Sequence, residues 1–154
     1  MTMSRISAFL GILFTLLFFW NSFQGDDADH FSERAKIAIR EVGNQNLLAN
    51  GDHTSLVLPV IELENQVFEL AFQQELALNP DSLLPIIKRT FQKAGLPEAY
   101  ILEVSKCSDA EVAYSFEMSS EENNTIIPCR GRVLPNACYT IQGQFREWPK
   151  KAIR

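Results

Sequence analysis

Two apolar patterns follow one another in the first third of this chain. The first 25 residues contain an apolar run, Ile6–Phe23, that carries no charged side chain. From residue 26 to residue 49, apolar residues recur at helical spacing, and acidic residues crowd the first turn. This second stretch is predicted to be a helix, and its apolar face holds Phe31, Ala35, Ala38 and Val42.

The following segments alternate between apolar and polar residues, which is typical of strands with one buried face. The clearest is Val67–Gln73, and Leu56–Leu63 resembles an edge strand because Pro59 interrupts it. A helix is predicted between Asn79 and Gly95, which have the residue types of its two caps. Three more strands are predicted at Tyr100–Cys107, Glu111–Met118 and Tyr139–Phe145.

This order predicts an α+β fold: an N-terminal membrane anchor and helix, then a mostly antiparallel sheet of about five strands with one further helix packed on it. We divide the chain into an anchor or signal peptide (1–25), a juxtamembrane helix (26–50), an extracytoplasmic α+β domain (51–147) and a basic tail (148–154).

The flanks of the apolar run predict its orientation. Arg5 precedes it and three aspartates follow it, so the N-terminus should be cytoplasmic and the domain periplasmic. No pair of small residues precedes a cleavage point, which favours an uncleaved, single-pass anchor in the inner membrane. Secretion to the periplasm after signal cleavage is the alternative.

Charge and motifs exclude several classes of function. The net charge is −5 and no basic patch is evident, which argues against nucleic acid as a partner. The chain has no nucleophile elbow, no phosphate-binding glycine loop and no zinc-protease pattern. We therefore expect no enzymatic activity, no cofactor and no metal site.

Three cysteines become relevant if the domain lies in an oxidising compartment. The pair Cys129–Cys138 closes the shortest loop and is the preferred disulfide, with Cys107 as the alternative partner. Arg130 and Arg132 lie inside this loop and Tyr139 follows it, so all three are candidate contacts for a ligand or partner. The arginines could instead pair with nearby glutamates or face water.

Several segments together resemble the extracytoplasmic sensor regions of membrane histidine kinases of the Bacteroidetes type. They are the anchor that runs into a helix, the helix 81–95 with Pro97 and Tyr100 after it, the run Glu111–Glu117, and the stretch Pro128–Tyr139 with its two cysteines. The resemblance covers most of the chain, and the last stretch is its most distinctive part.

The resemblance implies a periplasmic sensory or ligand-binding module of a signal-transduction system, without catalysis, since the histidine box and nucleotide-binding motifs of such kinases do not occur in these 154 residues. It implies a homodimer through the juxtamembrane helix and a sensor kinase as partner. The alternatives are an envelope structural or assembly factor that binds another envelope protein, and a truncated remnant of a sensor kinase.

Overall fold

The computed structural model describes residues 25–121, 125–128 and 131–146 of the chain. Contacts divide the chain into two compact units, Met1–Ser32 and Glu33–Arg154. Helix α2 (Gly25–Ala49) begins in the first unit, and its residues from Glu33 onward belong to the second. The predicted anchor, apart from Gly25, and the predicted basic tail lie outside the described residues. None of the helices described has the length and apolar character that crossing a membrane requires.

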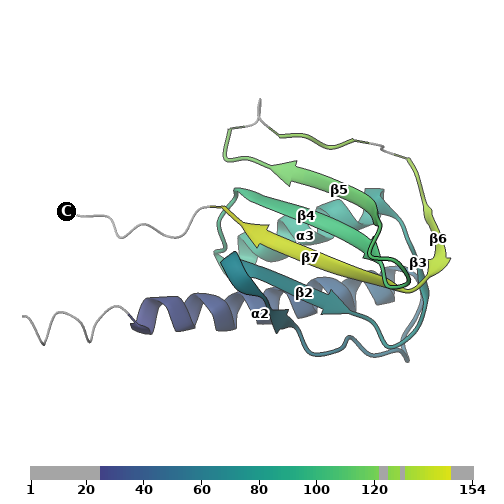
Figure 1. Ribbon diagram of the computed structural model, residues 1–154, viewed down its shortest axis with the longest axis horizontal. Coiled ribbons are helices and arrows are strands. Elements are labelled where there is room, and N and C mark those ends of the chain that lie inside the picture. Colours follow the sequence, from purple (N-terminus) through teal and green to yellow (C-terminus); the bar gives the residue numbers. More distant parts are fainter. Residues whose placement is uncertain (1–24, 122–124, 129–130, 147–154) are drawn as a thin grey trace, which may run out of the picture. The chain divides into compact units, whose positions relative to one another are not determined.

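The second unit is an α+β structure, as the sequence predicts (Figure 1). Its main sheet has five strands in the order β1-β2-β7-β4-β5, and neighbouring strands in it are antiparallel. A 3-10 turn at Glu64–Gln66 separates the first two strands. The main-sheet strands are β1 (Ile61–Glu62), β2 (Val67–Ala71), β4 (Tyr100–Lys106), β5 (Val112–Met118) and β7 (Tyr139–Phe145).

Helix α2 is held closely against the chain's own sheet. Its residues Ala35, Ala38 and Val42 are buried, at 0–3% exposure. At Gly43 the approach is so close that an added Cβ would lie 2.8 Å from Cδ2 of Leu70 on β2. The face that the sequence offers as a dimer seam is therefore covered by the second unit itself from Ala35 onward, and a dimer through α2 would need another face.

Helix α3 (Pro80–Ala94) begins and ends where its caps predict. The Asn79 side chain accepts a hydrogen bond from the backbone N–H of Asp81 at 3.0 Å, and Pro80 fills the first helical position, where no backbone donor is needed. Gly95 ends the helix with φ of +65°, a left-handed conformation that glycine adopts without strain. The apolar stripe of α3 faces inward, including Leu83, Ile87 and Phe91.

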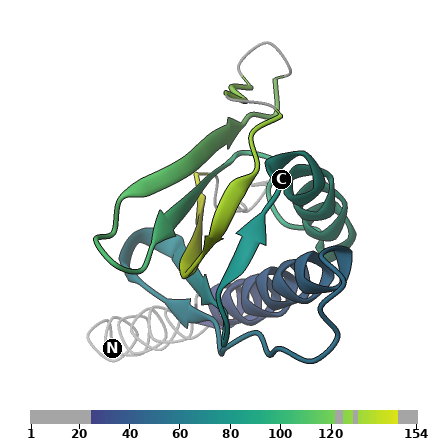
Figure 2. The same ribbon diagram turned by 90° about the vertical axis from the view of Figure 1, so that its right-hand side faces the viewer.

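The two helices cover one face of the main sheet, and the other face is open (Figure 2). Alternate residues of each long strand are buried toward the helices, as the period of two predicts. An aromatic cluster joins the layers: the Phe91 ring of α3 lies 5.0 Å from that of Tyr100 and 5.3 Å from that of Phe145, measured between ring centroids. Such tilted and edge-on pairs add to the stabilisation that burial provides.

Two short strands form a second sheet that the sequence does not reveal. Strand β3 (Leu76–Leu78) pairs antiparallel with β6 (Leu134–Ala137). The predicted edge strand Leu56–Leu63 forms only in parts: Val57 bridges to Phe72, and β1 supplies two paired residues. Pro59 lies between these two parts and cannot donate to a ladder, which explains the interruption.

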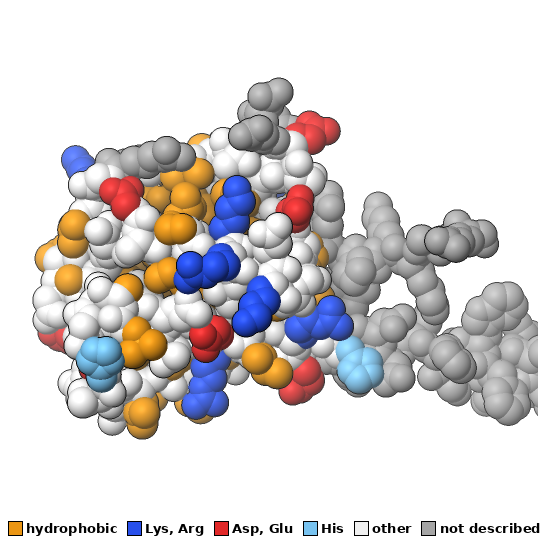
Figure 3. All heavy atoms as spheres, turned by 180° about the vertical axis from the view of Figure 1, so that it is seen from behind, with side chains coloured by type: hydrophobic (Ala, Val, Ile, Leu, Met, Phe, Trp, Pro, Cys, Tyr) orange, Lys and Arg blue, Asp and Glu red, His pale blue; other side chains and the backbone are white. Residues whose placement is uncertain are grey.

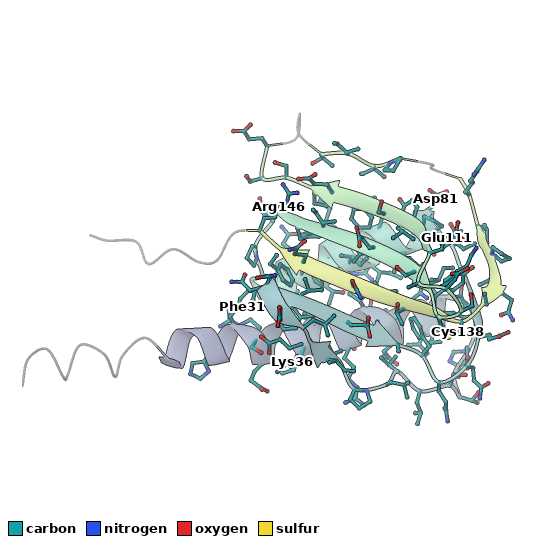
Figure 4. The ribbon with its side chains drawn as sticks, viewed as in Figure 1. Phe31, Lys36, Asp81, Glu111, Cys138 and Arg146 are labelled. Carbon is teal, nitrogen blue, oxygen red and sulfur yellow. A yellow bond between two sulfur atoms is a disulfide. The ribbon has the colours of Figure 1, made fainter. Side chains whose placement is uncertain are left out.

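A disulfide joins Cys107 to Cys138. This bond corrects the preferred prediction, Cys129–Cys138, in favour of the alternative partner; Cys129 and Arg130 lie outside the described residues. The register of the sheet explains the pairing. Lys106 of β4 lies opposite Tyr139 of β7, so the next pair outward is Cys107 and Cys138, whose backbones share a hydrogen bond of 3.0 Å. Figure 4 places Cys138 where β6 meets β7.

We predict that Cys107→Ser lowers the free energy of unfolding by about 3 kcal/mol, because loss of a disulfide that closes a loop of this length increases the conformational entropy of the unfolded chain. Urea unfolding of the full chain under oxidising conditions measures the change. Cys129→Ser is the matched control and should leave stability unchanged. Equal losses from both variants, or a Cys129–Cys138 peptide in a non-reduced digest, would contradict the pairing.

Candidate functional site: a cavity beside helix α3

A cavity of about 770 Å³ opens beside the C-terminal half of α3, within the second unit. This volume lies in the range of pockets that bind small molecules. Its walls come from α3, from the start of β4, from the end of β5 and from the segment that follows β5. The lining residues are Leu84, Lys88, Phe91, Gln92, Leu96, Pro97, Glu98, Tyr100, Met118, Ser119, Ser120, Thr125 and Ile127.

Helical spacing builds the first wall. Leu84, Lys88 and Gln92 follow one another at intervals of four residues, so their side chains form a row along one side of α3. The row spans about 12 Å at the rise of an α-helix. Phe91 and Leu96 add buried apolar surface beside it, whereas Lys88 and Gln92 are exposed, so this wall is of mixed polarity.

The opposite wall comes from the chain after β5. Met118 ends that strand, and Ile126 then pairs with Glu117 through two backbone hydrogen bonds of 2.9 Å, which brings the chain back along the strand's outer edge. The backbone N–H of Ser119 also donates to the Thr125 hydroxyl at 3.2 Å. These contacts hold the described part of this segment in place against the sheet.

Tyr100 contributes a buried hydroxyl whose hydrogen bond is not made. Its side chain is only 3% exposed, and its oxygen has no hydrogen-bond partner among the described residues. Desolvation by burial raises the pKa of this phenol above its ordinary value of 10.0, so the group stays protonated at neutral pH. Its oxygen is itself inaccessible to water, so a ligand acceptor would reach this donor only after neighbouring side chains move.

Two unpaired charges lie at the cavity. Lys88 and Glu98 line it, both are exposed, and neither has an ion-pair or hydrogen-bond partner in the described part of the chain. The three ion pairs found among described residues use other side chains, such as Lys36 with Glu62 at 3.0 Å (Figure 4). Both charges at the cavity are thus available to a ligand.

The residues that the sequence offers as contacts lie elsewhere. Arg132 is exposed beside Gly131, whose N–H donates to Asp81 at the start of α3 at 3.2 Å. Tyr139 is buried, and its hydroxyl donates to the Pro135 carbonyl at 2.8 Å, so contact with a ligand would require this hydrogen bond to break. Neither residue lines the cavity, and Arg130 lies outside the described residues.

Few sequence signals point to the residues that line the cavity. The helical spacing of Leu84 and Phe91 is typical of core positions, and a lysine such as Lys88 is favoured toward the C-terminal end of a helix. Only the change from apolar to polar residues along one side of α3 indicates that this side could form a cavity wall. Within the described ranges, no three histidine, cysteine, aspartate or glutamate side chains group as metal ligands would. Comparisons with protein-family models, with curated proteins and with solved structures found no match to this chain.

Chemically, the cavity combines apolar side chains with hydroxyl, amide and charged groups, and neither kind dominates its lining. Burial of apolar ligand atoms would contribute to the binding free energy, and the polar groups would set the orientation of the ligand.

We predict opposite effects from removing the two buried tyrosine hydroxyls. Tyr100→Phe removes an unpaired buried polar atom and should raise the free energy of unfolding by about 1 kcal/mol. Tyr139→Phe breaks the bond to the Pro135 carbonyl and should lower it by about the same amount. Urea unfolding of the two variants at pH 7 measures both, and a loss in Tyr100→Phe would show that its hydroxyl has a partner.

The free energy of unfolding at alkaline pH gives a second measurement on Tyr100. Its pKa is raised in the folded state, so the unfolded chain loses this proton first, and stability should fall as pH rises above about 10. Tyr100→Phe should flatten that fall. The pKa of Tyr139 is also raised by burial, so the Tyr139→Phe variant reports how much of the fall belongs to the other site.

Proposed function

We propose that this chain is a sensory, ligand-binding module of a signal-transduction system, held at the inner membrane by its N-terminal segment and facing the periplasm. The observation that carries the proposal is the cavity beside α3, with the unpaired charges of Lys88 and Glu98 at it. The resemblance to kinase sensor regions and the charges that flank the N-terminal apolar run support it. The kinase that would receive the signal is proposed as a separate partner.

The position of the cavity suits a sensor because three parts of the fold meet there. Its walls belong to α3, to the sheet and to the segment after β5. A ligand that contacts all three walls would favour the arrangement that binds it best, and this differential binding is what shifts a population between two states. The partner kinase could then respond to the changed position of the helices.

A ligand screen on two tryptophan variants tests this function. Gln92 lines the cavity and is exposed, so Gln92→Trp should fill the space with little effect on the core. Lys93→Trp is the matched control, since Lys93 is exposed on the same turn but does not line the cavity. We expect a small molecule that raises the unfolding temperature of the wild type and of Lys93→Trp by several degrees, and that has no effect on Gln92→Trp.

The screen uses the full chain in lipid nanodiscs, so that the N-terminal segment stays in its expected surroundings. The function is contradicted if no compound of a chemically diverse set raises the unfolding temperature of Lys93→Trp without raising that of Gln92→Trp. Ligands that stabilise all three proteins equally would point to a site elsewhere on the molecule.

A specific observation also favours the second candidate, an envelope assembly factor. Four large apolar residues are exposed along the β1 edge of the sheet: Leu56 (62%), Leu58 (39%), Ile61 (56%) and Leu63 (42%). Ile61 pairs with Glu69 of β2 and Val57 bridges to Phe72 just after β2, so this segment is the edge of the main sheet. An exposed edge with apolar side chains is suited to receive a strand from another protein.

A single charge on this edge tests the assembly role. We predict that Leu58→Lys abolishes recovery of one specific envelope protein with the full chain, because lysine on an edge strand opposes strand addition. The control is Ile126→Lys, which introduces the same charge at another exposed apolar residue, beside β5. Quantitative mass spectrometry compares the proteins recovered with each variant. Identical sets from the wild type and Leu58→Lys would exclude this edge as the binding surface.

A further inference from the structure

The charges of this acidic protein are unevenly distributed. The helical segments 33–49 and 80–94 carry six lysines and arginines against three acidic residues. The other described residues of the second unit include three basic and eleven acidic ones. Seen from the helix side, basic side chains gather over α2 and α3, with apolar surface beside them (Figure 3). A negatively charged small molecule would therefore approach the helix layer more readily than the rest of the surface.

Lys88 is where this basic surface meets the cavity. It lines the cavity, whereas its neighbour Arg89 does not and instead donates from Nη2 to the Gln45 side chain at 2.7 Å. Because the Lys88 ammonium has no partner among the described residues, it can pair with an anion without first breaking an existing bond. Its long side chain can also follow a ligand head group at the rim.

The other end of the cavity is unfavourable to an anion. Glu98 lines the cavity just beyond Gly95, where α3 ends and where the unpaired carbonyls of a helix concentrate partial negative charge. Apolar surface from Leu96 and Met118 lies in the same part of the lining. A ligand with one negative end and one apolar end would thus be oriented along α3, with its charge at Lys88.

We propose that the cavity binds a small carboxylic acid with an apolar tail, whose carboxylate pairs with Lys88 and whose tail lies between Phe91, Leu96 and Met118. The stretch from Lys88 to Gln92 covers about 6 Å of α3, and Leu96 lies beyond its end, which suits a tail of several carbon atoms. This inference rests on the proposed function, because it names the class of ligand for the same cavity. The Ser119 and Ser120 hydroxyls, which also line the cavity, offer further donors to the ligand.

Octanoate, octanol and octylammonium serve as probes, since they share a tail and differ in the charge of the head. Equilibrium dialysis of each labelled probe against the full chain in nanodiscs measures binding, and empty nanodiscs supply the background from the lipid. We expect octanoate to bind at least tenfold more tightly than the other two, because only its head pairs with the ammonium.

Three variants on or near α3 test the orientation. Lys88→Met keeps the length of the side chain and removes its charge, so octanoate affinity should fall about tenfold. Lys93→Met makes the same change in net charge outside the cavity and should leave affinity within about twofold. Glu98→Gln should raise octanoate affinity about threefold, because it removes the only acidic side chain among the described lining residues.

Each outcome decides something different. If octanol or octylammonium binds as well as octanoate, or if Lys88→Met and Lys93→Met weaken octanoate equally, the proposed ligand class is wrong. If no probe binds but another compound separates Gln92→Trp from Lys93→Trp, the ligand class fails and the sensory function stands. If no compound of any class separates the two tryptophan variants, the sensory function fails together with the ligand class.

Discussion

The fold depends on the pairing of β7 with strands on both of its sides. This last strand pairs with β2 on one edge and with all seven residues of β4 on the other. Because β2 and β4 are each antiparallel to β7, they run parallel to one another, and α3 makes the crossover between them. Helix α3 is thereby placed across the middle of the sheet, and its Phe91 lies over β4 and β7 residues Tyr100 and Phe145.

The same constraint creates the cavity. Strands β5 and β7 are both antiparallel to β4, so the chain leaves β5 beside Tyr100 and must re-enter β7 at the far end of the sheet. The connection returns along β5, where Ile126 pairs with Glu117, and then forms β6 against β3. It ends at the Cys107–Cys138 bond. One wall of the cavity is therefore a consequence of strand order, and the disulfide fixes the end of the segment that forms it.

Local patterns predicted most elements of the fold, because each long strand and each helix carries its own period. Asn79 and Gly95 define α3 from their caps alone. Short elements were missed, since three residues of β3 contain too little alternation, and Pro135 within β6 argues against a strand.

The disulfide prediction failed for a related reason. The shorter loop favours pairing of Cys138 with Cys129, whereas the register that places Cys107 opposite Cys138 is a property of the whole sheet. The cavity could not be predicted, because its walls are distant in sequence.

Packing of the ring and hydrogen bonding of the hydroxyl make opposite demands on Tyr100. Its ring lies against Phe91, Phe116 and Phe145, which fixes the side chain at the junction of helix and sheet. Satisfying its hydroxyl within the fold would require a polar group in this aromatic cluster, at a further cost in desolvation. The hydroxyl is instead left buried, without a partner among the described residues. In this part of the fold, close aromatic packing thus takes precedence over pairing of a single polar group.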